Sequence, residues 1–419
     1  MNPDVNPILV IGGGISGMTA AVEIAEVGYP VVLVEKEAYL GGRVMRSHKY
    51  FPKMCPPSCG FELNVRRIRN NPRISVHTLS TVEEITGTAG EFRARIKTRP
   101  RYVTGAVSLD DAVADGLTSE RPDEFNLGVG TTKAVYYPHP SAFPPLHVLD
   151  REALSESDVA ILTRAAPTGA IDLGMKEKEK WIDATAIIVA TGWRPYDATK
   201  LENLAFGQCE NVITNVLMER LAAPGGPTNG KIVRPSDGEP PKSVAFVQCA
   251  GSRDENHLPY CSAVCCMASL KQVRYLREQY EDVKVTVFYI DIRTIGRLEN
   301  FYYDLLGDGN VTFVKGKVAG IKEAPGAGKL VLDVEDTVAG QKPEPEFDMV
   351  VLATGIVPET ADSPIPFEVE MDEYGFLDGA TDVEGVYAAG CAKHPCDVSR
   401  ATKEATAAAL KAIQCVKRG

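Results

Sequence analysis

Four cysteines in the second half of the chain have a spacing that could do redox chemistry. Cys249, Cys261, Cys265 and Cys266 fall within 18 residues, and four thiolates are the number of ligands that a [4Fe–4S] cluster requires. Tetrahedral zinc also takes four cysteines, but its usual pairs have two to four intervening residues, unlike the adjacent Cys265 and Cys266. The spacing therefore favours an iron–sulfur cluster, with a redox-active dithiol and buried inert thiols as the alternatives.

A second pair of cysteines lies nearer the start of the chain. Cys55 and Cys59 flank Pro56 and Pro57, before a predicted helix from Gly60. A helix N-terminus lowers the pKa of a nearby thiol, so the pair could act as a redox dithiol. The alternatives are a stiff loop with two semi-buried thiols, or extra cluster ligands. We therefore leave this pair out of the predicted metal site.

A glycine-rich turn near residue 12 has the pattern of a dinucleotide-binding site. An apolar strand from Pro7, a glycine turn and a helical pattern follow one another. Gly12 permits the tight turn, Gly14 lets the backbone approach a pyrophosphate, and Gly17 lets helix and strand pack closely. The phosphates would meet the helix N-terminus. The predicted cofactor contacts here are Gly12, Gly13, Gly14, Ile15, Ser16 and Gly17.

An acidic residue follows the second predicted strand, Val31–Val34. Glu35 lies 23 residues after Gly12, where a carboxylate can accept hydrogen bonds from ribose hydroxyls and disfavours a 2′-phosphate. The segment that follows it resembles the corresponding segment of many flavoproteins with two dinucleotide-binding domains, which indicates FAD rather than NAD. This region adds Glu35, Lys36, Gly41, Gly42 and Arg43 to the predicted cofactor contacts.

Three later segments also resemble this class of flavoprotein. Two strands, Ala186–Gly192 and Met349–Gly355, close on Ala-Thr-Gly, which in such proteins marks a crossing between domains. The segment 385–390, before a small-residue helix from about Ser399, resembles the one that approaches the flavin. That class usually has Asp where this chain has Cys391. The resemblance adds Ala190, Thr191, Gly192, Thr354, Gly355, Gly390 and Cys391 to the predicted contacts.

The motifs together predict an α/β fold, a thioredoxin-reductase-like flavoprotein with two dinucleotide-binding domains. The predicted FAD domain comprises residues 1–100, 180–241 (which includes a linker) and 349–419. Residues 242–348 form the predicted second α/β domain, in which the cysteines replace the usual glycine turn after the strand Ser243–Gln248. Because a phosphate cradle needs small residues and free backbone N–H groups, we expect no NAD(P)H site there.

Composition narrows the class of function. The formal net charge of −11 leaves no general basic surface for nucleic acid or anionic lipid. No apolar run of 18 residues occurs, and the first residues lack the basic stretch of a signal peptide. We therefore expect a cytoplasmic protein that makes any membrane contact through a partner. Ten cysteines is a high count, and in a reducing compartment clustered cysteines more often hold metal or do redox chemistry than form disulfides.

The cysteine motif resembles that of one particular family. The sequence Cys249-Ala-Gly-Ser-Arg-Asp, followed by Tyr-Cys-Ser-Ala-Val-Cys-Cys-Met267, resembles the flavoprotein A subunit of heterodisulfide reductase. The resemblance extends over nearly the whole chain. It implies that these four cysteines bind a [4Fe–4S] cluster close to FAD.

One departure from that family lies in residues 101–179. Their flanks resemble those of an inserted ferredoxin module, yet no cysteine occurs between Cys59 and Cys209. The loss suggests a shortened relative, similar to the A subunits of the quinone-interacting membrane-bound oxidoreductase complexes of sulfate reducers. That resemblance implies three partners: adenylylsulfate reductase, a second homologous flavoprotein and iron–sulfur subunit, and a quinone-reactive membrane subunit.

The implied role is electron transfer through FAD and the cluster, with no acid–base residue required and none predicted as catalytic. A flavin passes electrons singly or in pairs, whereas a cluster passes one at a time. The alternatives are flavin-based electron bifurcation of the heterodisulfide reductase type, a free-standing NAD(P)H-dependent disulfide reductase using Cys55 and Cys59, and a scaffold that carries no current. The direction of electron flow is not encoded in any of these motifs.

Overall fold

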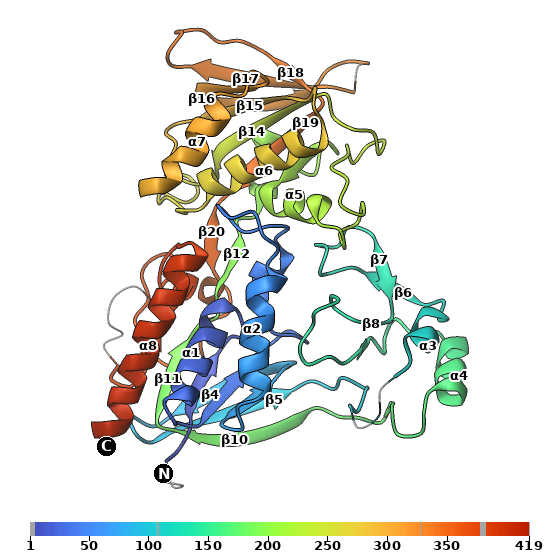
Figure 1. The fold of residues 1–419 in the computed structure, drawn as a ribbon, viewed down its shortest axis with the longest axis vertical. Helices are drawn as coiled ribbons and strands as arrows, with labels where there is room; N and C mark the ends of the chain where they lie inside the picture. Colours follow the sequence, from blue (N-terminus) through green and yellow to red (C-terminus); the bar gives the residue numbers. More distant parts are fainter. Residues whose placement is uncertain (1–4, 106, 108, 327, 378–382, 419) are drawn as a thin grey trace. The chain divides into compact units, whose positions relative to one another are not determined.

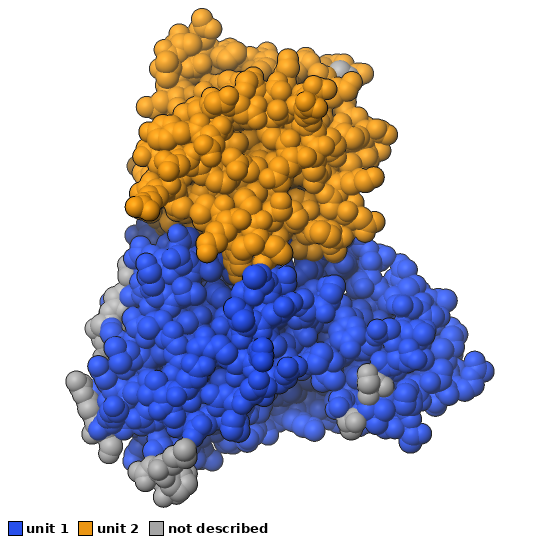
Figure 2. Space-filling model, in the orientation of Figure 1, with its two compact units in different colours: residues 1–46, 58–193, 358–419 blue, residues 47–57, 194–357 orange. Residues whose placement is uncertain are grey.

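The chain folds into two compact units, which Figure 2 colours separately. The structure is a computed structural model that describes residues 5–105, 107, 109–326, 328–377 and 383–418. Unit 1 contains Met1–Arg46, Ser58–Trp193 and Pro358–Gly419, and unit 2 contains Ser47–Pro57 and Arg194–Val357. The first unit is thus assembled from both ends of the chain, and each unit is described by itself below.

Unit 1 is built on a five-stranded parallel sheet with the strand order β21-β11-β1-β2-β3 (Figure 1). Its strands are β1 (Ile8–Ile11), β2 (Val31–Val34), β3 (Ile74–His77), β11 (Ala186–Val189) and β21 (Val386–Ala388). Its helices are α1 (Ile15–Glu26), α2 (Ser58–Arg69) and α8 (Val398–Arg418). The three central strands are entirely apolar and buried, as expected for a parallel sheet that is covered on both faces.

Alternate residues of β1 pack into different layers of unit 1. Ile8 and Val10 join a core formed with α1 and α8, which lie side by side in Figure 1. Leu9 and Ile11 join a core formed with an antiparallel sheet of order β10-β5-β4. That sheet contains β4 (Ser80–Thr86), β5 (Phe92–Thr98) and β10 (Lys178–Ala184). The strand period of two therefore fixes the order of helix layer, parallel sheet and antiparallel sheet.

The described residues of 101–179 belong to unit 1 and have a small apolar core of their own. Val103, Leu117, Val135 and Leu162 are among its buried residues. Its elements are α3 (Asp111–Asp115), β6 (Glu120–Pro122), β7 (Thr131–Lys133), β8 (Val135–Tyr136), β9 (Val148–Leu149) and α4 (Glu156–Ala165). A separate core fits an inserted segment, and a ferredoxin ancestry for it stays a prediction.

Unit 2 contains a seven-stranded sheet of order β13-β19-β14-β15-β16-β17-β18, parallel from β13 to β16 and antiparallel beyond it. The strands are β13 (Val212–Thr214), β14 (Ser243–Ala250), β15 (Lys284–Tyr289), β16 (Val311–Glu323), β17 (Leu330–Asp336), β18 (Glu346–Phe347) and β19 (Met349–Thr354). The helices are α5 (Asn215–Ala222), α6 (Cys265–Gln279) and α7 (Glu299–Leu306). The chain crosses between the units in β12 (Trp193–Pro195) and β20 (Ile356–Pro358).

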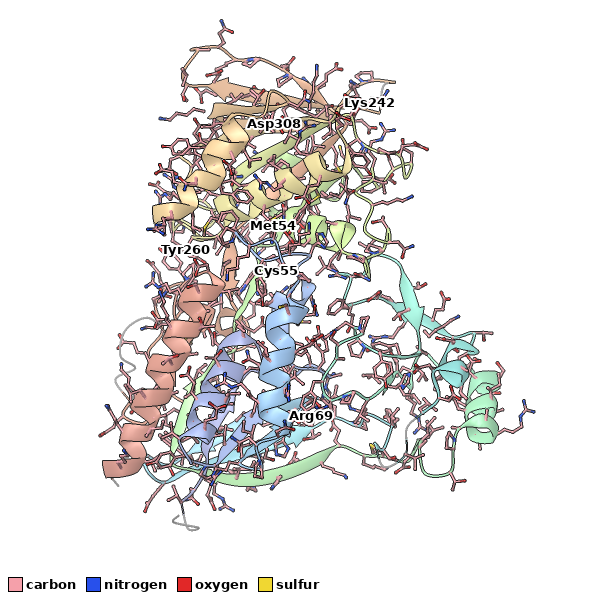
Figure 3. The ribbon with its side chains drawn as sticks, in the orientation of Figure 1. Met54, Cys55, Arg69, Lys242, Tyr260 and Asp308 are labelled. Carbon is pink, nitrogen blue, oxygen red and sulfur yellow. The ribbon has the colours of Figure 1, made fainter. Side chains whose placement is uncertain are left out.

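The short segment 47–57 packs on unit 2 although its neighbours in sequence belong to unit 1. The backbone N–H of His48 donates to the buried Glu219 at 2.9 Å, and the ammonium of Lys271 donates to the carbonyl of Lys49 at 2.7 Å. Met54, labelled in Figure 3, packs against the core of unit 2. Buried hydrogen bonds of this kind hold the segment in one position, because a buried polar group that is left unpaired costs free energy.

The unit boundaries differ from those predicted. The second unit begins at Arg194 rather than at residue 242, and it takes in residues 47–57. The predicted linker from Ala222 to Pro241 lies inside it, where the buried Ile232 joins its core. Proline and glycine in that stretch therefore shape turns within one unit and do not mark a boundary.

Candidate functional site

A pocket in unit 1 gathers most of the predicted cofactor contacts. It opens at the carboxyl ends of β1, β2 and β11, where parallel sheets bind their ligands. The predicted residues that line it are Gly12, Gly14, Ile15, Ser16, Glu35, Lys36, Gly41, Gly42, Arg43, Ala190, Thr191, Gly192 and Cys391. These residues come from four stretches of sequence as far apart as Gly12 and Cys391, so their convergence is a property of the fold.

Three further predicted residues shape this pocket without lining it. The N–H of Gly13 donates to the Glu35 carboxylate at 2.6 Å. A Cβ on Gly17 would stand 1.8 Å from the carbonyl oxygen of Gly12, and one on Gly390 would stand 2.2 Å from Ser16 Oγ. The first is an approach of backbone to backbone within the turn, which only glycine permits. The second brings the late segment against the Ser16 side chain at a glycine with φ +65°.

The turn has the features that an anionic cofactor needs. Gly12 has φ +105°, and a Cβ there would lie 2.3 Å from the carbonyl oxygen of Ala190. A Cβ on Gly14 would meet nothing within 4 Å, and no side chain caps the N-terminus of α1. The buried hydroxyl of Thr191, also in the pocket, has no hydrogen-bond partner among the described residues. Uncapped helix N–H groups and a spare hydroxyl suit a bound pyrophosphate group.

Glu35 is the buried acid of the pocket, with 6% of its surface exposed. Burial raises the pKa of its carboxyl to about 7, although the N–H groups of Glu37 and Gly13 hydrogen-bond to the carboxylate and act in the opposite direction. The two N–H donors hold one oxygen each, at 2.8 Å and 2.6 Å. The carboxylate is therefore fixed in position, with further lone pairs available for ribose hydroxyls.

This raised pKa predicts a pH-dependent stability of the flavin-free chain. The folded state holds the Glu35 proton more tightly than the unfolded state, so stability from this group is complete below about pH 4 and is lost as the pH rises through 7. Wild type should therefore lose about 3 kcal/mol of unfolding free energy, relative to the Glu35→Gln variant, when the pH is raised from 4 to 8. Urea unfolding at several pH values measures this, and a pH-independent difference would contradict it.

Cationic side chains also border the pocket. The Arg43 guanidinium donates to the carbonyl of Trp193 and lies 5.3 Å from the centre of its indole ring. Burial lowers the pKa of Arg43 to about 10, so it keeps its charge at neutral pH. Lys36 pairs with Glu359. The residues that sequence reasoning did not assign to this pocket are Glu37, Tyr39, Val44, Arg46, Trp193, Glu359, Cys396, Asp397, Val398 and Ala401.

A separate cavity in unit 2 is lined by all four cysteines of the predicted metal site. Cys249 comes from the end of β14, Cys261 from the loop after it, and Cys265 and Cys266 from the first turn of α6. Cys261 therefore lies outside the helix, which begins at Cys265. The other lining residues are Ser252, Arg253, Ser262, Ala263, Asp291 and Arg293.

Local backbone irregularities point the cysteines into one space. The pairing of β14 with β19 shifts register between Val247 and Ala250, and Cys249 within that shift has φ +58°. The loop is then held by side chains. Ser252 and Ser262 share a hydrogen bond of 2.9 Å, and the hydroxyl of Tyr260, labelled in Figure 3, donates to the carbonyl of Ile356 at 2.9 Å. A left-handed cysteine is costly, which marks the site as constrained.

Thr354 and Gly355 lie beside the residues that line this second cavity and do not line the pocket of unit 1. Both lie in unit 2, and neither is among the residues that line the pocket. Cys265 Sγ donates to the carbonyl of Thr354 at 3.5 Å. A Cβ on Gly355 would lie 2.2 Å from Ser252 Oγ, so glycine is needed to fit the cysteine loop. The second Ala-Thr-Gly supports the thiols rather than the predicted flavin site.

The four thiols of this cavity are the ligand set of a cubane iron–sulfur cluster, which takes each thiolate on a different iron. Among the described residues, no group of three or more His, Cys, Asp or Glu side chains has the arrangement of a single-ion site. Burial raises the pKa of Cys249 to about 11 and also that of Cys265, so these thiols are neutral until a metal displaces their protons.

Cys55 and Cys59 fall in different units. Cys55 lies in the segment 47–57 of unit 2 and is half-buried, whereas Cys59 is exposed in the first turn of α2 in unit 1. The predicted helix from Gly60 therefore begins two residues earlier, at Ser58. Neither cysteine lines the pocket of unit 1 or the cysteine cavity of unit 2.

Comparison with known proteins agrees with this geometry. Residues 7–192, which hold the glycine turn and the first Ala-Thr-Gly, match the family of FAD-dependent oxidoreductases. The chain is 35% identical to an iron–sulfur A subunit of the CoB–CoM heterodisulfide reductase of Methanopyrus kandleri, over 98% of this chain and 64% of that protein. It is a homologue of the heterodisulfide reductase A subunits. The A subunit of the ferredoxin:CoB–CoM heterodisulfide reductase of Methanosarcina mazei is also 35% identical, over 98% of this chain and 53% of that one.

These matches confirm the predicted FAD and the oxidoreductase class. The chain spans between about half and two thirds of the length of these heterodisulfide reductase A subunits. Its fold is that of thioredoxin reductase, as predicted: the enzyme of T. acidophilum aligns with a TM-score of 0.54 at 15% identity, over 98% of each chain. The bacillithiol disulfide reductase of Bacillus cereus aligns with a TM-score of 0.53 at 15% identity, over 99% of this chain and 100% of that one. Among the described residues, no helix is both long and apolar enough to cross a membrane.

Proposed function

We propose that this chain is the electron-transfer flavoprotein of a multi-subunit oxidoreductase of the heterodisulfide reductase type, carrying FAD in unit 1 and a [4Fe–4S] cluster in unit 2. The observation that supports it most is the single cavity lined by Cys249, Cys261, Cys265 and Cys266. Over 98% of its own length, the chain is 35% identical to a relative that is named as an iron–sulfur subunit. The flavin and cluster together would connect two-electron donors to one-electron carriers.

In this proposal the residues of unit 1 bind and orient FAD. The N–H groups at the start of α1 hold the pyrophosphate, and the absence of a side chain at Gly14 lets the backbone reach it. Glu35 accepts the ribose hydroxyls, and Thr191 Oγ1 gains the partner that it lacks within the described residues. Arg43 and Arg46 add positive charge to the pocket wall. No proton transfer by a side chain is needed.

In unit 2 the four cysteines hold the cluster, and the charged residues beside them tune it. Arg253 and Arg293 both interact with Asp291 at the wall of the cavity. Arg253 also lies close enough to Cys249 to oppose the rise in the pKa of that thiol. Positive charge next to a cluster favours its reduced, more negative state. These arginines would therefore make the cluster a better electron acceptor.

A free-standing NAD(P)H-dependent disulfide reductase is the main competitor, because the solved structures with this fold include one that is named a disulfide reductase. A nicotinamide cofactor would need its pyrophosphate at the carboxyl end of β14, the strand that precedes the cysteine loop. The chain has the buried Cys265 and Cys266 at the start of the following helix, where Cys265 Sγ donates to the carbonyl of Thr354. A dinucleotide cradle there would have to displace the thiols.

The proposal predicts that NADPH does not reduce the flavin of the isolated chain. Anaerobic, FAD-loaded protein mixed with NADPH should keep its oxidised flavin absorbance near its starting value for minutes, whereas dithionite bleaches it at once. The matched measurement uses a thioredoxin reductase as a positive control under the same conditions. Bleaching by NADPH within a few seconds would favour the disulfide reductase interpretation instead.

A finer proposal concerns the partners. The chain has no cysteine between Cys59 and Cys209, and in this it resembles the A subunits of the quinone-interacting complexes of sulfate reducers. That resemblance favours three partners: adenylylsulfate reductase, a second flavoprotein and a quinone-reactive membrane protein. Co-purification from native membranes tests this interpretation. Recovery with thiol-disulfide or hydrogenase partners, and without a quinone-reactive protein, would return the proposal to the general heterodisulfide reductase type.

A further inference from the structure

Two buried cysteines border the pocket of unit 1, apart from the four that line the cavity of unit 2. Cys391 lies in the short 3-10 helix η6 (Gly390–Ala392), and Cys396 lies two residues before α8. Their sulfur atoms are 3.7 Å apart, and only 7% and 5% of the two residues is exposed. Both line the pocket that holds the predicted FAD contacts. The sequence motifs single out Cys391 alone, as a departure from the usual aspartate.

We propose that Cys391 and Cys396 form a redox-active dithiol that exchanges two electrons with FAD bound in this pocket. The inference rests on the proposed FAD site. In the oxidising direction both S–H bonds break and one S–S bond forms. Two electrons and one proton pass to oxidised FAD, and the second proton leaves to solvent, which balances the step as a two-electron couple.

The geometry leaves little movement for this bond to form. A disulfide has its sulfurs about 2.05 Å apart, so the observed separation must shrink by roughly 1.7 Å, a distance that side-chain rotation covers. The two cysteines are joined by a loop of only four residues, which keeps them together in both states. Gly390, which has no Cβ, lets η6 approach Ser16 at the start of α1, the helix end proposed to hold the pyrophosphate.

The surroundings favour redox chemistry over an inert pair. Cys391 Sγ donates to the carbonyl of Cys396 at 3.4 Å, and the two thiols hydrogen-bond to each other. That contact lowers the pKa of Cys391 and raises the pKa of Cys396, so one of the two thiols is the easier to ionise.

Burial determines which partner the pair can meet. Because both side chains are more than nine-tenths buried, a large external disulfide cannot reach either sulfur without local opening. Both cysteines line the pocket of unit 1. Electrons would therefore enter and leave the pair through the flavin, and the dithiol would store one electron pair beside it.

Reductive titration of the holoprotein tests whether Cys391 and Cys396 store an electron pair. Anaerobic dithionite should deliver two more electrons per chain to wild type than to the Cys391→Ser, Cys396→Ser double variant, because any flavin and cluster contribute equally to both. Cys415→Ser is the matched control, since Cys415 is equally buried in α8 but does not line the pocket. It should take up as many electrons as wild type. Equal uptake by wild type and a double variant that retains FAD would overturn the proposal.

Thiol mapping of wild type keeps the test decisive if the double variant loses FAD or fails to fold. The protein is denatured in acid from its oxidised and reduced states, alkylated and digested. We expect a peptide linked through Cys391 and Cys396 in the oxidised state, and two alkylated cysteines after reduction. If both thiols were free in both states, in protein that contains FAD, the proposed redox role of the pair would be overturned and the proposed flavin site would stand. Absence of FAD from the purified wild-type chain would instead overturn the proposed flavin site and this inference with it.

Discussion

Replacing Cys265 with serine is expected to abolish the iron–sulfur cluster, lowering the iron content from roughly four atoms per chain to near zero. Cys265 is the most enclosed of the four ligands, and its sulfur already contacts the carbonyl of Thr354 at the wall of the cavity. A hydroxyl at that position is a far weaker iron ligand than a thiolate. Iron analysis and EPR of dithionite-reduced, anaerobically purified protein measure the loss.

The matched control for this change is Cys209→Ser. Cys209 is a half-buried thiol of the same unit that packs on the core beside the sheet and does not line the cavity. The control should keep the iron content and EPR signal of wild type. FAD content should be unchanged in both variants, because the flavin residues belong to unit 1. A Cys265→Ser protein with normal iron and an unchanged signal would remove the basis for the cluster.

Local chemistry made the pocket of unit 1 predictable from the sequence. Strand β1, the turn at Gly12 and helix α1 are adjacent in sequence, so their spacing alone encodes the cradle. Glu35 follows because the next parallel strand must end at the same edge of the sheet. Cys396 escaped notice because no short motif contains it. The only available signal was a second cysteine five residues after Cys391, which becomes meaningful once both are found in one pocket.

The repeated Ala-Thr-Gly shows what local sequence could not decide. Thr191 follows β11, which pairs with β1, the strand that leads into the glycine turn. Thr354 ends β19, which pairs with β14, the strand that leads into the cysteines. The two motifs thus have equivalent positions in their own sheets, and only strand pairing assigns one to the flavin pocket and the other to the thiols. Likewise, the segment 47–57 joins unit 2 through long-range contacts with Glu219 and Lys271 that no local pattern signals.

A pair of glycine substitutions should separate folding from FAD binding in unit 1. Gly17→Ala places a methyl group 1.8 Å from the carbonyl oxygen of Gly12, so backbone must move and we expect a loss of stability of about 3 kcal/mol. Gly14→Ala meets no protein atom within 4 Å, and Gly14 has φ −72°, which alanine adopts readily. That variant should fold normally.

The Gly14→Ala variant should nevertheless bind FAD poorly, because its methyl group occupies the space through which the turn approaches the pyrophosphate. We expect Gly14→Ala to weaken FAD binding by about 100-fold, or roughly 2.7 kcal/mol, with the melting temperature of the flavin-free protein unchanged. Gly60→Ala, in α2 and also free of contacts at its Cβ, is the control and should bind FAD as wild type does. Fluorescence titration with FAD and thermal unfolding supply the two readouts. If Gly14→Ala bound FAD normally, the pyrophosphate could not lie against the start of α1, and the pocket would have to hold the flavin in another orientation.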